Sequence, residues 1–319
     1  MKVGLKGHYR VTKNKPGEDE ATVTEFDNLI TDYGLNRLLN GSSFSSSVAH
    51  CVVGTGVTEP SVTNLNITAA HKQASQVSFE ATAGPLEDLP ALERTITFKY
   101  VFNPGVITST VTEIGTKDIN AALNNNTLFS HSLIKDTNGN PTTLTVLPDE
   151  YLNVYYSLTF KFPDKGTWVS LTKDIGGVPT RIRMKMINIT RTGLTENGLS
   201  EMCGFNHVSF HAYNTGAAIM TADEETYVDP GSASVWMLDS FYYAQSITCS
   251  RTISSKNGVF TRRARIKFTP QSGGRIFGTM SLKSSNSSSP MYVIEATPPI
   301  HKTNEQEFNL DLDFSLSRL

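Results

Sequence analysis

The residues of this chain that could carry out chemistry are few, and the first group lies in the second half of the sequence. His207 and His211 are four residues apart, with Cys203 before them and Asp223 after them. On a strand, residues i and i+4 share a face, so a transition-metal site is conceivable there. Cys203 keeps the same parity, but no fourth ligand follows at a spacing known from zinc sites. We therefore expect a polar strand face, with no metal and no cofactor.

Two acidic clusters are the next candidates for chemistry. Asp311 and Asp313 are two residues apart, and residues 223–225 read Asp-Glu-Glu. Paired carboxylates hydrolyse glycosides, but Asp311 and Asp313 fall on the polar side of an alternating strand. The second cluster lies in a loop that lacks the spacing of a calcium-binding loop. Since the sequence also lacks a nucleophile elbow, a phosphate-binding loop and a dinucleotide fingerprint, we predict that the chain is not an enzyme and has no catalytic residues.

A basic run lies on one later strand. Arg263, Arg265 and Lys267 share one parity, and Arg262 precedes them. Nucleic-acid binding needs a broader positive patch, and the net charge of the chain is −2. The pattern indicates a stripe that faces solvent or another subunit, and no nucleic-acid partner.

The aromatic residues leave two interpretations open. Trp168 and the cluster Phe241-Tyr242-Tyr243 could form a surface on which sugars stack, or a protein interface. The core is the more common location for Phe241 and Tyr243.

The elements that must position these residues are strands. Ser, Thr and Asn make up about 28% of the 319 residues, and charged residues make up 18%. Thr suits the exposed face of a sheet, while Ser and Asn suit turns. No segment has the length and apolar character of a membrane span or a signal peptide. Three widely spaced cysteines, Cys51, Cys203 and Cys249, predict unpaired thiols in a protein made in a reducing cytosol.

Period-2 alternation marks the strands themselves. Apolar residues at 96, 98 and 100 alternate with polar ones, and the same pattern runs over 152–160 and 308–316. Asn257-Gly258 predicts a tight hairpin. One short helix is expected from about Asp32 to Leu39, with Thr31 or Asp32 as its N-cap.

An internal repeat organises these strands. Residues 94–117 align with 260–283 at a constant shift of 166, which places Phe102 over Phe268 and Lys117 over Lys283. Further blocks match in the same order on both sides. The sequence therefore predicts an all-β protein of two tandem, related β-sandwich domains, with one short helix near the start of the first. We place domain 1 at residues 1–165, a linker at 166–177 and domain 2 at 178–319.

The first repeat resembles a family of tail-associated structural modules of bacteriophages. The resemblance rests on an ordered set of short motifs that cover most of residues 7–160. They are Gly7-His8-Tyr9, Phe26-Asp27-Asn28-Leu29-Ile30-Thr31-Asp32 with Gly34-Leu35, Gly54-Thr55-Gly56 with Pro60-Ser61, Asn103-Pro104-Gly105, Glu113-Ile114-Gly115, Leu128-Phe129-Ser130 leading to Asp136, and Pro141-Thr142-Thr143-Leu144-Thr145-Val146 with Leu152-Asn153-Val154-Tyr155-Tyr156. The second half departs strongly from this pattern.

The resemblance implies a structural virion protein, made in the cytoplasm of a host bacterium and assembled in the phage tail. Its partners would be itself, as a threefold or sixfold homo-oligomer, and other tail proteins of a fibre, appendage, sheath or collar. The alternatives left open are a module that recognises a host glycan and a capsid decoration protein. The N-terminal residues 1–20 are a candidate strand for exchange between neighbouring subunits.

Overall fold

A computed structural model describes most of the first half of the chain and the principal strands of the second half. The described residues are 2–40, 42–83, 93–120, 122–123, 125–162, 168–186, 208–212, 242–243, 246–249, 254–268, 275–284, 292–303 and 305–319.

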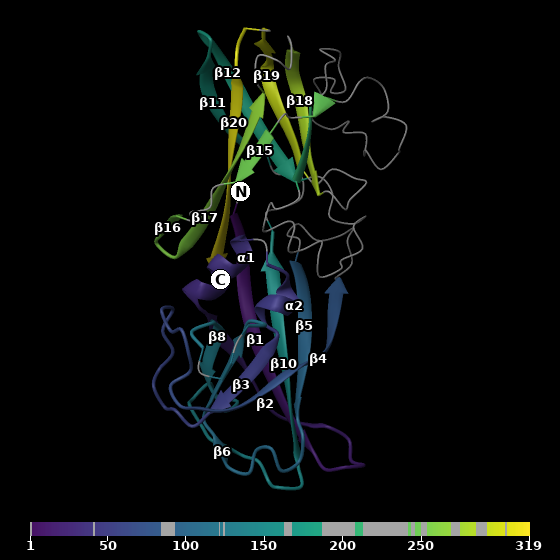
Figure 1. The fold of residues 1–319 in the computed structure, drawn as a ribbon, viewed down its shortest axis with the longest axis vertical. Coiled ribbons are helices and arrows are strands. Elements are labelled where there is room, and N and C mark those ends of the chain that lie inside the picture. The colour runs from purple at the N-terminus through teal and green to yellow at the C-terminus, as the bar shows by residue number, and fades with distance from the viewer. Residues whose placement is uncertain are drawn as a thin grey trace.

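The first half forms a closed, eight-stranded antiparallel barrel (Figure 1). Its strands are β1 (Lys2–Asn14), β2 (Ala21–Ile30), β3 (His50–Gly54), β4 (Ala70–Ala83), β5 (Glu93–Phe102), β7 (Glu113–Lys117), β8 (Leu128–Leu133) and β10 (Tyr151–Lys161). Around the barrel the order is β10-β5-β4-β3-β7-β8-β2-β1. Pairing of β1 with β10, from Gly4 opposite Lys161 to Asn14 opposite Tyr151, closes the ring.

The prediction of two tandem β-sandwich domains is therefore wrong, although the chain consists mainly of strands. A strand with one buried face alternates in the same way in a sandwich and in a barrel. The difference depends on whether the first and last strands of the sheet pair with each other. That contact between β1 and β10 joins residues more than a hundred positions apart and leaves no local pattern in the sequence.

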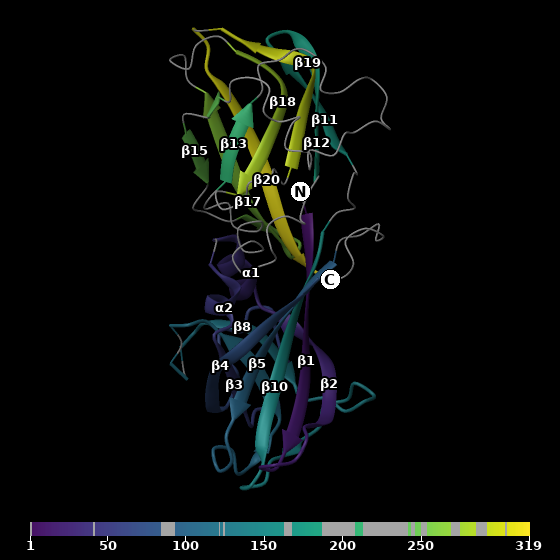
Figure 2. The ribbon, with the colours of Figure 1, turned by 90° about the vertical axis from the view of Figure 1, so that its right-hand side faces the viewer.

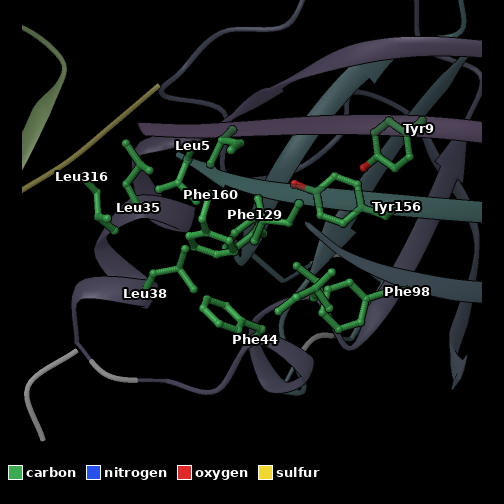
Figure 3. Packing of buried hydrophobic residues seen from close by; sticks show 14 of the residues in the cluster. Leu5, Tyr9, Leu35, Leu38, Phe44, Phe98, Phe129, Tyr156, Phe160 and Leu316 are labelled. Carbon is green, nitrogen blue, oxygen red and sulfur yellow. The ribbon is translucent and has the colours of Figure 1, made fainter. Parts of the chain in front are cut away.

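Two helices cover one end of the barrel. Helix α1 (Asp32–Leu39) confirms the expected helix, and Thr31 is its N-cap, accepting a hydrogen bond from the Gly34 backbone N–H at 3.0 Å. Helix α2 (Phe44–Ser47) follows. Figure 3 shows Leu35, Leu38 and Phe44 from these helices packed with Phe160 of β10. The remaining short strands of this half, β6 (Thr110–Val111) and β9 (Leu144–Thr145), pair with each other.

The second half contributes to two sheets. Its strands are β11 (Val169–Ile175), β12 (Val178–Met186), β13 (Val208–Ala212), β14 (Tyr242–Tyr243), β15 (Ser246–Cys249), β16 (Ser254–Lys256), β17 (Val259–Phe268), β18 (Arg275–Ser284), β19 (Tyr292–Lys302) and β20 (Phe308–Arg318). Strands β20, β17 and β15 continue the sheet of the barrel, because β20 pairs in parallel with the start of β1. A separate six-stranded sheet has the order β11-β12-β19-β18-β13-β14.

The strand order of the second half follows that of the barrel. Strands β11, β12, β19, β18 and β13 neighbour one another as β1, β2, β8, β7 and β3 do. Strand β14 pairs with β13 and β15 pairs with β17 in the other sheet, so these two short strands together take the place of β4, and β17 and β20 follow as β5 and β10 do. The register agrees as well: Phe102 lies opposite Leu152, and Phe268 lies opposite Phe308. Phe102 and Phe268, aligned in the sequence, thus occupy equivalent places. One link differs, because among the described strands β11 does not pair with β20.

Two segments expected to be connections or tethers are strands. Residues 169–175, inside the predicted linker, form β11 and pair with β12 along their whole length. Most of the N-terminal segment forms β1, which pairs with β2, β10 and β20 of its own chain. The structure thus places the predicted exchange strand inside its own barrel.

A single large cluster of buried apolar side chains runs through both halves. Phe98 and Phe314, expected on the apolar faces of their strands, are 0% and 2% exposed. The Asn257-Gly258 hairpin also forms, with Asn257 at φ 52° and Lys256 opposite Val259. In the part of the chain that the structure describes, neither helix has the length and apolar character to cross a membrane.

Candidate functional site

The most elaborate polar site in the described residues surrounds Glu113, on β7 inside the first half. The side chain of Glu113 is fully buried. Its Oε1 accepts hydrogen bonds from the backbone N–H groups of Gly56 at 2.9 Å and Ala69 at 2.7 Å. Its Oε2 accepts from the Thr68 N–H at 2.9 Å and lies 3.1 Å from His131 Nε2. Four donors therefore converge on one carboxylate.

The hydrogen bonds decide the ionisation of this carboxylate. Burial alone would raise the pKa of Glu113, but the hydrogen bonds from His131 and from three backbone amides outweigh burial and hold the pKa below its ordinary value. The other ring nitrogen of His131, Nδ1, lies 3.1 Å from Asn64 Oδ1, which also accepts from the Ser61 N–H at 2.6 Å. Both ring nitrogens of His131 thus face oxygen acceptors.

The site joins motifs that are far apart in the sequence. The Gly-Thr-Gly turn at 54–56 and the strand that begins with Glu113 meet here, and a Cβ at Gly56 would overlap Glu113 Oε1. The site fixes the long loop between β3 and β4. Two apolar side chains of this loop are exposed, Val57 to 77% and Leu65 to 46%. Every carboxylate oxygen already has protein donors, so the geometry is that of a clamp on a loop, and it leaves no lone pair directed at a substrate.

A second buried charge serves the neighbouring loop. Lys117, at the end of β7, is fully buried, and its Nζ donates to Asn66 Oδ1, Ala122 O and Leu123 O at 3.0, 3.3 and 2.9 Å. Burial lowers the pKa of Lys117 to about 8. Three acceptors match the three donors of an ammonium group, so Lys117 fastens the turn after β7 to the loop before β4.

Arginines from the second half bind the end of the barrel. Arg262 is 7% exposed, and its Nη1 donates to Leu39 O at 2.6 Å. Arg318 donates through Nε to Ile30 O at 2.5 Å and through Nη2 to the Asp32 carboxylate. These donors satisfy carbonyls at the two ends of the segment that contains α1. Figure 3 shows Leu316 of β20 beside Leu35 of α1, which adds an apolar contact to the same junction.

The predicted basic stripe lies on an exposed face, and the structure pairs it with acids. Arg263 binds Asp313 through two hydrogen bonds of 2.7 and 2.8 Å, and Arg265 binds Asp311 through two of 2.7 Å. Lys267 lies 2.7 Å from Glu307. The stripe and the acidic pair of the sequence are therefore one ladder of ion pairs across β17 and β20. Each of these three positive charges has an adjacent carboxylate, which does not favour a phosphate backbone as ligand.

The equivalent face of the barrel carries different chemistry. Thr95 and Thr159 share a hydrogen bond of 2.8 Å, as their counterparts Thr261 and Ser315 do. At the next positions the second half has Arg–Asp pairs directly across the two strands, whereas in the barrel Lys99 forms its ion pair, of 2.7 Å, with Glu20 outside them. The barrel pairs are Thr97 with Ser157 and Lys99 with Tyr155; the corresponding pairs are Arg263 with Asp313 and Arg265 with Asp311.

The other residues singled out in the sequence lie apart from these sites. Cys203, His207, residues 223–225 and Phe241 are outside the described residues, and the side chains of His211, Tyr242, Tyr243 and Cys249 are not described. Cys51 is buried and unpaired, as predicted, and burial raises the pKa of its thiol. Among the described residues there is no group of three or more metal-ligating side chains. Trp168 stacks with Arg183, whose guanidinium carbon is 4.2 Å from the ring centroid.

Sequence reasoning missed the partners of Glu113 and the role of Arg262. Glu113 belongs to the Glu-Ile-Gly motif, but its parity is opposite to that of the core-facing Ile114, so alternation alone predicts an exposed carboxylate. Its burial comes from the loop between β3 and β4, which covers this outer face of β7. Arg262 has the parity of Phe260 and Ile266, opposite to the stripe, and that parity indicated an inward position. Comparison with known protein families, with curated proteins and with solved structures gave no match for this chain.

Proposed function

We propose that this chain is a non-enzymatic structural protein of a tailed-phage virion that assembles as a homo-oligomer in the tail. The observation that carries the proposal is the clamp at Glu113. It is built from the Gly-Thr-Gly, Pro-Ser and Glu-Ile-Gly motifs on which the resemblance to phage tail modules rests. These motifs hold an exposed loop on the barrel. Loops positioned by such a scaffold commonly form the surfaces with which a protein contacts its partners.

The use of charge supports a structural role. The buried Glu113 and Lys117 are saturated by groups of the same chain. On the outer face of β17 and β20, the charges neutralise one another in pairs. In this proposal the described ionisable groups shape and solubilise a surface, and none acts on a substrate.

The relation between the two halves supports assembly. Equivalent three-stranded units, β4-β5-β10 and β15-β17-β20, differ in the residues paired across their outer faces: hydroxyl pairs and Lys99 beside Tyr155 on the first, and Arg–Asp pairs on the second. One subunit therefore carries two faces of similar shape and different chemistry. Such a subunit can contact two different neighbours in a closed ring.

The test is a cryo-EM reconstruction of the phage particle whose genome encodes the chain, together with mass spectrometry of purified particles. We expect symmetric density for the chain on the tail. Density on the capsid shell would indicate a decoration protein, and a chain missing from purified particles would contradict a virion role altogether. Binding of the purified chain on a glycan array would favour the receptor-recognition alternative.

A further inference from the structure

The second half ends in an open strand edge where the barrel is closed. In the barrel, β1 lies between β2 and β10 and pairs with both. Its equivalent, β11, pairs with β12 and has no other partner among the described strands, so it ends the six-stranded sheet. Figure 2 shows β11 and β12 at the side of the second half, apart from β20. The outer edge of β11 thus presents backbone donors and acceptors to a further strand.

Two apolar side chains on the core side of β11, Val169 and Leu171, are exposed, whereas Ile175 at its end packs against the core. Val169 lies opposite Met184 and Leu171 opposite Ile182, and both β12 residues pack against the core. Alternation places Val169 and Leu171 on that same side. Nevertheless Val169 is 56% exposed and Leu171 is 51% exposed.

The barrel shows what covers this position when a neighbouring strand is present. The sequence shift of 166 and the strand registers, followed from β7 and β18 through β8 and β19 to β2 and β12, place Ile182 at the position of Phe26. Leu171, opposite Ile182, is therefore the counterpart of Tyr9, opposite Phe26. Tyr9 is fully buried. The strand beside it is β10, which runs antiparallel and brings Tyr156 directly opposite Tyr9. An antiparallel strand with alternating apolar residues is therefore the kind of element that fits against β11.

We infer that β11 is a contact strand between two copies of this chain, which pair their β11 edges antiparallel around a twofold axis at Thr172. The segment 169–175 is complementary to itself in this register. The pairs are Val169 with Ile175 of the partner subunit, Ser170 with Asp174 of the partner subunit, and Leu171 with Lys173 of the partner subunit.

Several features favour a second copy as the occupant. The register places no like charges directly opposite each other and groups the apolar side chains of both strands on the core side, with the Lys173 stem lying along Leu171 of the partner subunit. A twofold contact needs only one self-complementary patch, which this strand supplies. The contact also extends the six-stranded sheet of each copy without a break. The inference gives a specific surface to the homo-oligomer of the proposed function, and it is tested without the virion.

The first experiment measures the oligomeric state of the purified full-length chain by analytical ultracentrifugation over a range of concentrations. We expect a dimer at the highest concentrations. Leu171→Lys should yield a monomer, because the new ammonium faces Lys173 of the partner subunit. Leu65→Lys, at an exposed apolar residue of the barrel loop, is the matched control and should remain dimeric. A wild-type monomer at all concentrations, or a dimer that survives Leu171→Lys, would overturn the inference.

The second experiment tests the register by disulfide trapping under a mild oxidant. On the twofold axis, position 172 faces itself, and opposed Cα atoms in antiparallel strands lie about 4.5–5.5 Å apart, within the range of a disulfide. Thr172→Cys should therefore give a covalent dimer, identified by peptide mass spectrometry as a bridge between two copies of position 172. In this register, position 170 lies four residues along the strand from position 170 of the partner subunit. Ser170→Cys should therefore not give a covalent dimer. The reverse result would rule out the register, and crosslinking of neither variant would rule out the contact. Either failure would leave the location of the chain in the virion, and so the proposed function, untouched.

Discussion

Glu113 lies on the outer face of β7, opposite to the core-facing Ile114, and the loop between β3 and β4 buries it there. Removing a carboxylate from water is costly, and here four donors offset that cost. Three of them are backbone amides of the loop between β3 and β4, which has no strand partners of its own to satisfy them. The carboxylate therefore accepts the hydrogen bonds of both ends of the loop, while His131 and Lys117 bind its middle through Asn64 and Asn66.

Glu113→Gln should destabilise the fold by about 3 kcal/mol, because the amide nitrogen would face donors that remain buried without an acceptor. Denaturant unfolding measures this loss, and limited proteolysis should show faster cleavage within the loop before β4. Glu59→Gln, at an exposed position of the same loop, is the matched control and should leave both unchanged. Equal unfolding midpoints for the two variants would contradict the clamp.

Lys117 makes stability depend on pH in a defined direction. Its pKa is about 8 in the folded chain and 10.5 ordinarily, so between these values the unfolded chain holds a proton that the folded chain has released. Unfolding then takes up protons, and stability from this group rises as pH increases from about 8 to 10.5. Over this pH range, the free energy of unfolding of the wild type should therefore increase relative to that of Lys117→Met. Lys72→Met, at an exposed residue, should show no such pH dependence relative to wild type.

The sequence was informative about residues that face solvent and less so about buried polar ones. The parity of Arg263 and Arg265 placed them on an outer face, and the structure confirms it. The ladder that pairs them with Asp313 and Asp311 depends on the register of β17 with β20, which parity alone does not determine. The donors to Glu113 come from a loop and from β8, so no local pattern links them.

Among the elements, strands and the helix were predicted well because their signals are local. Alternation of apolar residues correctly predicted the buried faces of β5, β10 and β20, and the capping residue Thr31 correctly predicted the start of α1. Closure of the barrel was not predictable in this way, since it depends on one contact between the first and last strands. The interior of a closed barrel and the interior of a sandwich select the same residues.

Phe98→Ala and Phe314→Ala should each destabilise the fold by about 3–5 kcal/mol, as expected for the loss of a large buried side chain. The two residues lie on the buried faces of β5 and β20, one in each half. Phe79→Ala is the matched control, because Phe79 lies opposite Phe98 on β4 but is 43% exposed. Thermal melts of all three variants measure the difference, and a Phe79 effect as large as the other two would contradict the difference in burial.

At the scale of the whole molecule, the two halves are joined by backbone pairing, by arginines and by one apolar core. The start of β1 pairs with the end of β20, so the first and last strands of the chain meet at the junction. Arg262 and Arg318 bind the backbone on either side of α1, which also covers the end of the barrel. The helix is thus held from both sides, and unfolding of either half removes a support of the other.

We therefore expect the wild-type chain to unfold in one cooperative transition, and Arg262→Ala to weaken that coupling. Arg262 donates to Leu39 O from a buried position, so its loss should cost about 2–3 kcal/mol and separate the transitions of the two halves. The neighbouring Arg263→Ala is the matched control: it lies on the opposite face of β17, where its ion pair with Asp313 is exposed to solvent. Because exposed ion pairs contribute little, this variant should unfold like the wild type. Differential scanning calorimetry distinguishes one transition from two, and a single unshifted transition in Arg262→Ala would show that β1 and the shared core couple the halves without the arginine.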